Sequence, residues 1–114
     1  MAGWFDLTKN TAGQFHFVLK AGNAETILTS QLYTTKGAAE TGIASVQTNS
    51  ALDERFDRKV ASNGQHYFTL KAANQQVIGT SQMYQSAASR DTGIASVRTN
   101  GPTATIKDTT TDSA

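Results

Sequence analysis

One stretch of the chain occurs twice at a constant spacing. Leu19-Lys20-Ala21 returns as Leu70-Lys71-Ala72, and Thr41–Val46 returns as Thr92–Val97, so the offset is 51 in both cases (70 − 19 and 92 − 41). A gapless duplication of this size predicts two copies of one supersecondary unit, each too small to bury its apolar face alone. The repeat therefore constrains the fold far more than it constrains the activity.

The length agrees with one shared core. The chain has 114 residues, the usual size of a single domain, whereas units of about 50 residues bury too little surface to fold well alone. We therefore expect one domain over residues 1–107, made of repeats at about 4–54 and 55–107. The polar segment 108–114 is predicted to be a disordered tail.

Composition excludes several classes of protein. The chain has no cysteine, so disulfides, thiolate catalysis and cysteine-ligated zinc are ruled out. Its net charge of +1 provides no strong field for nucleic acid or a membrane. No stretch approaches the roughly 18 apolar residues of a membrane span, and the first residues do not resemble a signal peptide. We expect a cytoplasmic protein.

Alternation of apolar and polar residues predicts the strands. The clearest example is Gln14–Lys20, in which Phe15, Phe17 and Leu19 share one face. Turn-forming residues separate this segment from its neighbours. The predicted strands are Trp4–Lys9, Gln14–Lys20, Thr26–Ser30, Arg55–Ala61, Gln65–Lys71, Val77–Ser81 and Thr103–Lys107.

A change of period predicts one helix in each repeat. In the first repeat, Thr34-Thr35 can cap a helix whose apolar stripe is Ala39, Ile43 and Val46. We expect Asn49 to end it in the left-handed conformation. The second helix is predicted at about Ser86–Thr99.

Gly42 and Gly93 lie inside these helices, where glycine costs about 1 kcal/mol relative to alanine. The predicted compensation is a close approach of the helix backbone to the sheet, at a place where any Cβ atom would clash.

The predicted fold class is α+β. Two tandem β-β-β-α(-β) repeats form one antiparallel sheet with both helices packed on one face, and the other face stays open to solvent. An internal pseudo-twofold axis should relate Phe17 to Phe68 and Ile43 to Ile94. Because the chain pairs its two units internally, we expect a monomer.

Three motifs occur in the same order in both repeats: Phe17–Asn23, Ile27–Tyr33 and Gly42–Asn49 in the first copy. In this combination the chain resembles the YegP-like family of small bacterial tandem-repeat proteins. The resemblance spans roughly residues 4–107. It implies that the units join into one sheet and exchange their carboxy-terminal strands. The segment near Leu52 to Ala61 would then close the first unit and open the second, and Thr103–Lys107 would close the second.

The resemblance carries over no established activity, and no catalytic, cofactor or metal-binding residue is inherited. The histidines do not suggest one either, because His16 and His66 are 50 residues apart rather than 51 (66 − 16). Their rings should therefore point to opposite faces of the sheet. Carboxylates at equivalent positions of the repeats, such as Asp6 and Asp57, are expected to lie apart and solvated. We expect a non-enzymatic protein without a cofactor.

The open face of the sheet is the candidate binding surface, with His16, Lys20, Tyr67 and Lys71 as its candidate residues. The favoured hypothesis is an interaction module that binds a macromolecule, such as a protein, through this face or through a groove between the repeats. The alternative is single-stranded nucleic acid stacked on the sheet. A positive stripe through Lys20, Lys71 and Arg58 would favour nucleic acid, and mixed charge would favour protein.

A third alternative is a small-ligand or enzymatic site between the helices. A deep polar pocket containing His66 or Asp91 would indicate it. Tyr33 and Tyr84 precede the helices, and each ring is predicted to pack over the strand-to-helix corner, with ligand stacking as the less favoured role.

Overall fold

A single sheet holds both repeats together. The computed structural model describes residues 3–108, without the side chain of Thr103. These residues form seven strands and two α-helices, together with two short 3₁₀ turns at Asp53–Arg55 and Gly101–Thr103. The elements are β1 (Trp4–Lys9), β2 (Phe15–Lys20), β3 (Thr26–Thr29), α1 (Lys36–Asn49), β4 (Phe56–Val60), β5 (His66–Lys71), β6 (Val77–Thr80), α2 (Ala87–Asn100) and β7 (Thr105–Asp108).

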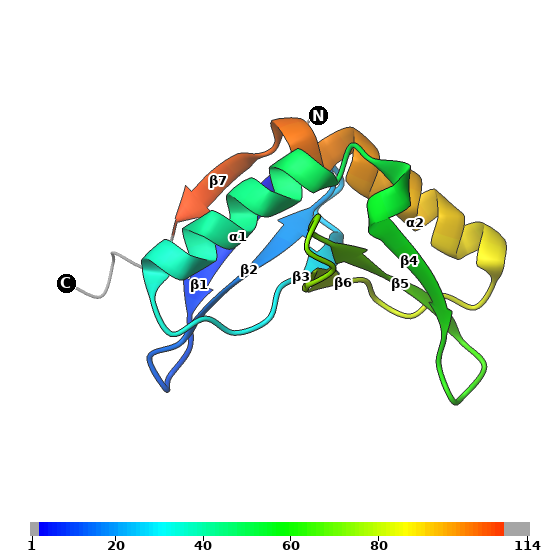
Figure 1. Ribbon diagram of the computed structural model, residues 1–114, viewed down its shortest axis with the longest axis horizontal. Coiled ribbons are helices and arrows are strands. Elements are labelled where there is room, and N and C mark those ends of the chain that lie inside the picture. Colours follow the sequence, from blue (N-terminus) through cyan, green and yellow to red (C-terminus); the bar gives the residue numbers. More distant parts are fainter. Residues whose placement is uncertain (1–2, 109–114) are drawn as a thin grey trace.

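The strand order in the sheet is β4-β5-β6-β3-β2-β1-β7. Each repeat contributes a three-stranded antiparallel meander, and the two meanders meet where Thr29 of β3 pairs with Thr80 of β6. Both helices cover the same side of this sheet. The turns of the β1–β2 and β4–β5 hairpins point away from the helices and away from each other (Figure 1). The predicted α+β class and the placement of the helices are confirmed.

The prediction of a wholly antiparallel sheet is wrong at one edge, because β7 runs parallel to β1. The end of α2 lies beside the start of β1, where the Gly3 amide donates a hydrogen bond to the Asn100 side chain (3.0 Å). The chain therefore enters β7 at the end of the sheet where β1 also begins. Asp108, which was predicted to open the tail, is the last residue of β7 and pairs with Lys36 of α1. Residues 109–114 of the predicted tail lie outside the described part.

The implied exchange of strands is present for β7. This strand follows α2 of the second repeat yet pairs with β1 of the first, whereas β4 pairs with β5 of its own repeat. The expectation that the segment near Leu52 to Ala61 also closes the first unit is wrong, because β4 pairs with β5 alone among residues 3–108. Closure of the second unit by Thr103–Lys107 is wrong as well, since β7 joins the first unit.

Both helices begin at a capping hydroxyl. Thr35 Oγ1 accepts a hydrogen bond from the Ala38 amide (3.1 Å), and Ser86 Oγ accepts one from the Ser89 amide (3.1 Å). The predicted cap at Thr35 is confirmed. The left-handed ending at Asn49 is wrong: Asn49 stays helical, donates from its side chain to the Ser45 carbonyl (2.8 Å) and accepts from Arg55 Nε (3.0 Å). Both the amide nitrogen and the amide oxygen of the Asn49 side chain are therefore hydrogen-bonded at the last turn of α1.

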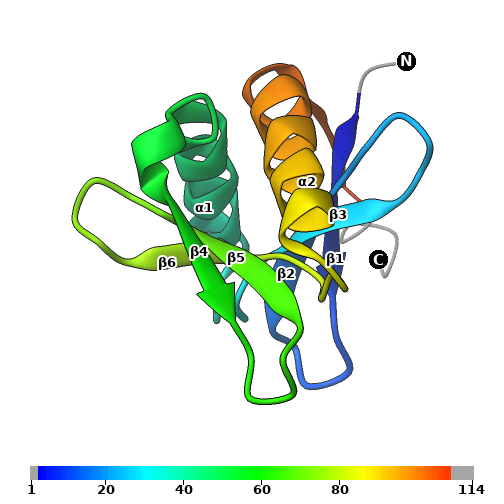
Figure 2. The same ribbon diagram turned by 90° about the vertical axis from the view of Figure 1, so that its right-hand side faces the viewer.

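Both helices lie over one face of the sheet (Figure 2), and the buried apolar side chains of the helices and strands form the core. The two repeats build it in the same way, with Phe5 edge-on to Phe17 at 5.8 Å and Phe56 edge-on to Phe68 at 5.7 Å. Phe17 and Phe68 are fully buried. The strand faces predicted from the alternating pattern are therefore correct.

The repeats differ where their pseudo-symmetry brings them together. Leu28 of β3 and Gly79 of β6 are equivalent positions, since their numbers differ by 51 (79 − 28). Leu28 is fully buried, and a Cβ atom placed on Gly79 would lie 2.6 Å from its Cγ atom. Only one of the two equivalent positions can therefore carry a large side chain.

Candidate functional site: an open sheet face and two inter-repeat clefts

The sheet face opposite the helices, called the open face here, carries the four predicted candidate residues. His16 and Lys20 alternate with the buried Phe17 and Leu19 of β2, and Tyr67 and Lys71 have the corresponding positions in β5. All four side chains are half-buried. Their shared face follows from strand alternation.

Charge on the open face is mixed. Lys59 Nζ and Lys71 Nζ lie 3.4 Å and 3.6 Å from Asp57 Oδ2. Burial alone would raise the pKa of Asp57, but the hydrogen bonds and charges of these two lysines lower it below its ordinary value. At the β1–β7 edge, Lys107 Nζ lies 4.4 Å from the centre of the Trp4 ring, a cation–π contact. The aromatic and basic groups of this face are therefore partly engaged with one another.

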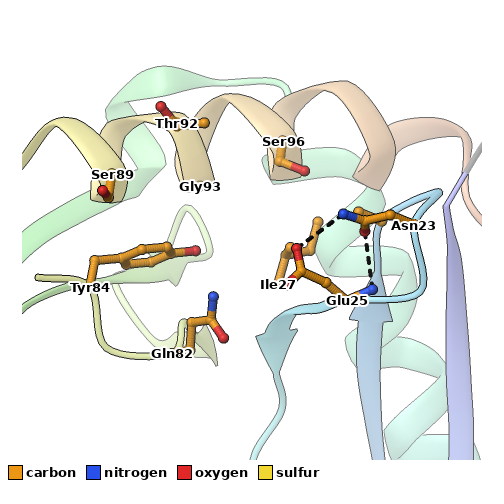
Figure 3. A pocket seen from close by; sticks show the side chains of 10 residues that line it. Asn23, Glu25, Ile27, Gln82, Tyr84, Ser89, Thr92, Gly93 and Ser96 are labelled. Atoms are coloured by element: carbon orange, nitrogen blue, oxygen red, sulfur yellow. Dashed lines mark hydrogen bonds between the residues drawn. The ribbon is translucent and has the colours of Figure 1, made fainter.

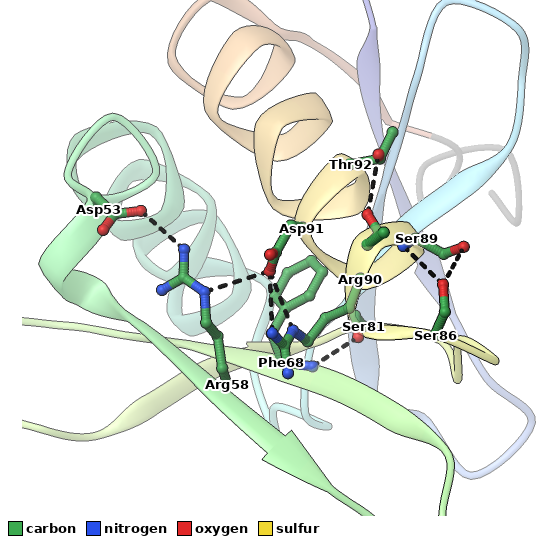
Figure 4. Close-up of polar contacts among 10 residues, drawn as sticks. Asp53, Arg58, Phe68, Ser81, Ser86, Ser89, Arg90, Asp91 and Thr92 are labelled. Carbon is green, nitrogen blue, oxygen red and sulfur yellow. Dashed lines mark hydrogen bonds and ion pairs between the residues drawn. The ribbon is translucent and has the colours of Figure 1, made fainter.

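Arg58 does not lie on the open face, so the positive stripe through Lys20, Lys71 and Arg58 does not exist. Its guanidinium turns to the helix side, where it contacts Asp53 (3.2 Å) and Asp91 of α2 (3.4 Å), as Figure 4 shows. Arg90 is the main cause of a lowered pKa at Asp91, and Arg58 adds to it. The repeat alignment contained this information, because Arg58 is equivalent to Leu7, which is buried beneath the helices.

The two histidines point to opposite sides of the sheet, as predicted. His16 Nδ1 lies within hydrogen-bonding distance of Thr8 Oγ1 on the open face (3.3 Å). His66 shares a face with the core residue Phe68, and its Nδ1 atom is buried without a hydrogen-bond partner. No group of three or more His, Cys, Asp or Glu side chains within residues 3–108 is arranged to hold a metal ion. In the same part of the chain, neither helix is long and apolar enough to cross a membrane.

A cavity of about 370 Å³ lies between α2 and the turn that joins β2 to β3. Its two walls come from different repeats: the turn belongs to the first repeat and the helix to the second. Figure 3 shows polar atoms of Gln82, Tyr84 and Ser96 on one side and Glu25 on the other. We call this cavity the first cleft; its lining residues are Ala21, Asn23, Glu25, Ile27, Gln82, Tyr84, Ser89, Thr92, Gly93 and Ser96.

A second cleft of about 200 Å³ lies at the pseudo-symmetric position, between α1 and the turn that joins β5 to β6. Residues equivalent to those of the first cleft line it, with the roles of the repeats reversed. Two differences are chemically important: Gln76 replaces Glu25, and Ala38 replaces Ser89. The first cleft is therefore larger and carries a carboxylate that the second lacks.

Tyr84 packs as predicted for the corner between strand and helix. Its ring is nearly parallel to that of Phe68, and the two ring centres are 6.3 Å apart. Its hydroxyl lies so close to α2 that a Cβ atom on Gly93 would overlap it. The predicted close approach at the helical glycines is confirmed, although the neighbour is a tyrosine hydroxyl and not the sheet backbone. Burial raises the pKa of Tyr84, a hydrogen bond with Gln82 lowers it, and the charge of Glu25 raises it further.

The sequence analysis found the tyrosine but missed the cleft. The third alternative placed a pocket between the helices around His66 or Asp91, and neither residue lines the first cleft. The repeat alignment pairs Tyr84 with Tyr33 but does not indicate which turn faces which helix. Which turn faces which helix depends on how the two repeats pack against each other.

Comparison with known proteins identifies the family. Two segments, residues 10–57 and 61–108, each match the family model of a domain of unknown function, DUF1508. The chain belongs to the DUF1508 family. Its relatives in that family include the UPF0339 protein YegP of Escherichia coli K12, which is 64% identical over 110 residues, 96% of this chain and 100% of the relative. The UPF0339 protein of Shewanella oneidensis is 61% identical over the same shares of the two chains.

Solved structures of DUF1508 proteins have the same fold. The solution NMR structure of YegP from E. coli matches with a TM-score of 0.92 and 63% identity, over 98% of this chain and 97% of that one. The NMR structure of the Shewanella oneidensis UPF0339 protein matches with a TM-score of 0.92 and 60% identity, over 98% and 95%. DUF1508 is a family of unknown function, and the predicted YegP-like membership is confirmed.

Proposed function

We propose that this DUF1508 chain is a non-enzymatic interaction module that binds another protein through the open face of its sheet. The observation that carries the proposal is the face itself. It lies opposite both helices (Figure 1) and presents an aromatic and a basic side chain from each repeat, Trp4 with Lys20 and Tyr67 with Lys71. Aromatic and mixed polar groups are typical of protein interfaces.

The balance of charge supports a protein partner over nucleic acid. Asp57 pairs with both Lys59 and Lys71, so one negative charge lies between the two basic groups of the second repeat on this face. Lys107 lies over the Trp4 ring, which a stacking base would need. A phosphate backbone binds best to a row of cations that has no carboxylate beside it. These side chains do not form such a row.

The non-enzymatic part of the proposal rests on how the titratable groups are engaged. His16 and His66 face opposite sides of the sheet. Asp57 and Asp91 lie on opposite sides of the sheet, and each is held by cations. General acid–base chemistry needs a titratable group within hydrogen-bonding reach of the proton that it transfers.

The test is a comparison of matched variants as immobilised baits in bacterial extract. A partner of the open face should be retained by the unchanged protein and lost with Lys20→Ala/Tyr67→Ala. It should still be retained with the control Glu40→Ala/Glu54→Ala, whose positions are exposed and lie off this face. Retention of the same proteins by all three baits contradicts the proposal, as does the absence of any retained protein.

The second candidate function is single-stranded nucleic-acid binding, and the half-buried Tyr67 on the same face of β5 as Lys71 is the observation that favours it. Adding short single-stranded DNA and RNA to the labelled protein tests it by amide NMR. Shifts clustered on His16, Lys20, Tyr67 and Lys71 support this candidate. Unchanged spectra remove it and leave the protein partner.

A further inference from the structure

We propose that the first cleft is a binding site for a small organic cation with a primary ammonium group, and that Glu25 provides the counter-charge. This site is separate from the open face, so it goes beyond the proposed function. The cavity measures about 370 Å³, which lies in the range of small-ligand sites.

Glu25 is fixed in position but has no cation beside it. The Asn23 side chain donates to Glu25 Oε1 (3.0 Å), and the Glu25 amide donates back to Asn23 Oδ1 (3.1 Å). These two bonds tie the residue to its turn, so the carboxylate is held at the rim of the cleft (Figure 3). Within residues 3–108 no lysine or arginine forms an ion pair with it, although seven ion pairs occur elsewhere in that part.

The neutral groups opposite Glu25 suit an ammonium ligand. An ammonium group has three donors and no acceptor, so it needs oxygen atoms on several sides. The Tyr84 and Ser96 hydroxyls and the Gln82 amide oxygen face the same space as Glu25 (Figure 3). Because burial and Glu25 both raise the pKa of Tyr84, its phenol stays uncharged at neutral pH.

The rest of the lining suits the carbon chain of such a ligand. Ile27 is buried at the base of the turn, and the half-buried ring of Tyr84 lines the same cleft. A short alkyl chain can pack on these groups while its charged end meets Glu25. The chemistry of the cleft therefore favours a linear alkylammonium over an anion or a sugar.

The second cleft is an internal control supplied by the chain. It repeats the tyrosine, glycine and serine of the first cleft as Tyr33, Gly42 and Ser45. It lacks the carboxylate, because Gln76 occupies the position of Glu25. If the charge decides binding, the two clefts should differ in affinity, and exchanging these side chains should exchange the affinity.

The test is an amide NMR titration of the full chain with 1,4-diaminobutane, with butane-1,4-diol as the neutral control of equal length. Nα-acetyl-lysine amide is titrated separately, because an ammonium group could come from a free amine or from a lysine side chain of another protein. Three proteins are compared: the unchanged chain, Glu25→Gln and Gln76→Glu.

The proposal predicts saturable shifts at residues 21–27 and 89–96 of the unchanged chain with at least one of the two ammonium probes, and none with the diol. Glu25→Gln should weaken binding by up to about fivefold, as expected for the loss of an exposed charge pair. Gln76→Glu should produce new saturable shifts at residues 38–45 and 72–78. The tighter probe identifies the source of the ammonium group.

Three results would overturn the proposal: no saturable shift with either ammonium probe, equal affinity in Glu25→Gln, or equal binding of the diol. Both substituted side chains are exposed, so all three proteins should fold. A negative result here leaves the open-face proposal untouched, because Lys20 and Tyr67 are unchanged in every variant.

Discussion

Gly42 and Gly93 show how a single missing side chain shapes this molecule. Each lies in a helix where glycine is unfavourable by about 1 kcal/mol, yet each is needed because a tyrosine hydroxyl lies against the helix backbone. A Cβ atom on Gly42 would lie 2.5 Å from Tyr33 Oη and 3.0 Å from Phe17 Cε2. Since Tyr33 stacks on Phe17, the ring cannot move aside freely. The same contact forms one wall of each cleft.

Gly42→Ala should therefore destabilise the protein by about 1–3 kcal/mol, the usual cost of overpacking. The matched control is Gly37→Ala in the first turn of the same helix, where a Cβ atom would meet nothing within 4 Å. This control should stabilise the protein by about 0.4–1 kcal/mol. Urea denaturation of both variants measures the difference. Equal stabilisation by both alanines would show that the tyrosine contact is not a constraint.

Asp91 provides a prediction for pH. Arg90, and to a lesser degree Arg58, lower the pKa of this carboxyl in the folded chain. A lowered pKa means that the interaction stabilises the fold above the unfolded-state pKa, and that this contribution is lost as pH falls through the folded value.

Arg90→Gln should raise the pKa of Asp91 more than Arg58→Gln does, and Arg98→Gln should leave it unchanged, because Arg98 contacts Asp53 instead. Carboxyl NMR titration measures all three. A larger rise with Arg98→Gln would contradict this assignment of contacts.

The strand β7 illustrates what can and cannot be predicted at the level of elements. Its existence followed from the pattern in Thr103–Lys107, but its direction did not, because a short strand of alternating residues fits an edge in either direction. The direction depends on where α2 delivers the chain, and the bond from the Gly3 amide to Asn100 places that point beside the start of β1. Local patterns do not encode such long-range geometry.

The candidate sites divide in the same way. Alternation alone was sufficient to assign Lys20 and Tyr67 to one face. Arg58 was misassigned although its equivalence to Leu7 was visible in the repeat, so that error was avoidable. The first cleft was not predictable from the pattern of one repeat. Glu25 belongs to the first repeat and Tyr84 to the second, so they line one cleft only because the two repeats pack together.

Deleting residues 105–114 should remove β7 and expose the edge of β1. We expect a loss of roughly 2–6 kcal/mol, since about four backbone hydrogen bonds disappear at 0.5–1.5 kcal/mol each. The control is a chain that ends after Asp108, which keeps β7 and its ion pair with Lys36. Urea denaturation of both chains, with hydrogen exchange of the β1 amides, measures the effect. Equal stability of the two chains would show that β7 contributes little.

The molecule as a whole depends on a difference between its halves. Leu28 and Gly79 occupy equivalent positions beside the pseudo-twofold axis, and one side chain fills the space available to both. The halves are therefore complementary as well as similar. This complementarity specifies that the first repeat pairs with the second.

The predicted consequence is strong coupling between the two positions. Gly79→Leu should destabilise the protein by overpacking, and Leu28→Gly should do so by about 2–5 kcal/mol or more through the cavity it leaves. The exchanged pair, Leu28→Gly with Gly79→Leu, should be more stable than the sum of the single effects implies, because one leucine again fills the space. A double-mutant cycle by urea denaturation measures the coupling, and simple additivity would contradict it.

The leucine and glycine at this junction also have a meaning for the history of the gene. A duplicated gene can usually shrink back to one copy when recombination removes the second. Here a chain made from either copy alone, associating with itself, would bring two leucines into collision or leave two glycines facing an empty space. Because these positions differ, we expect that neither half can replace the other, so that loss of either copy would remove the partner that the remaining half needs.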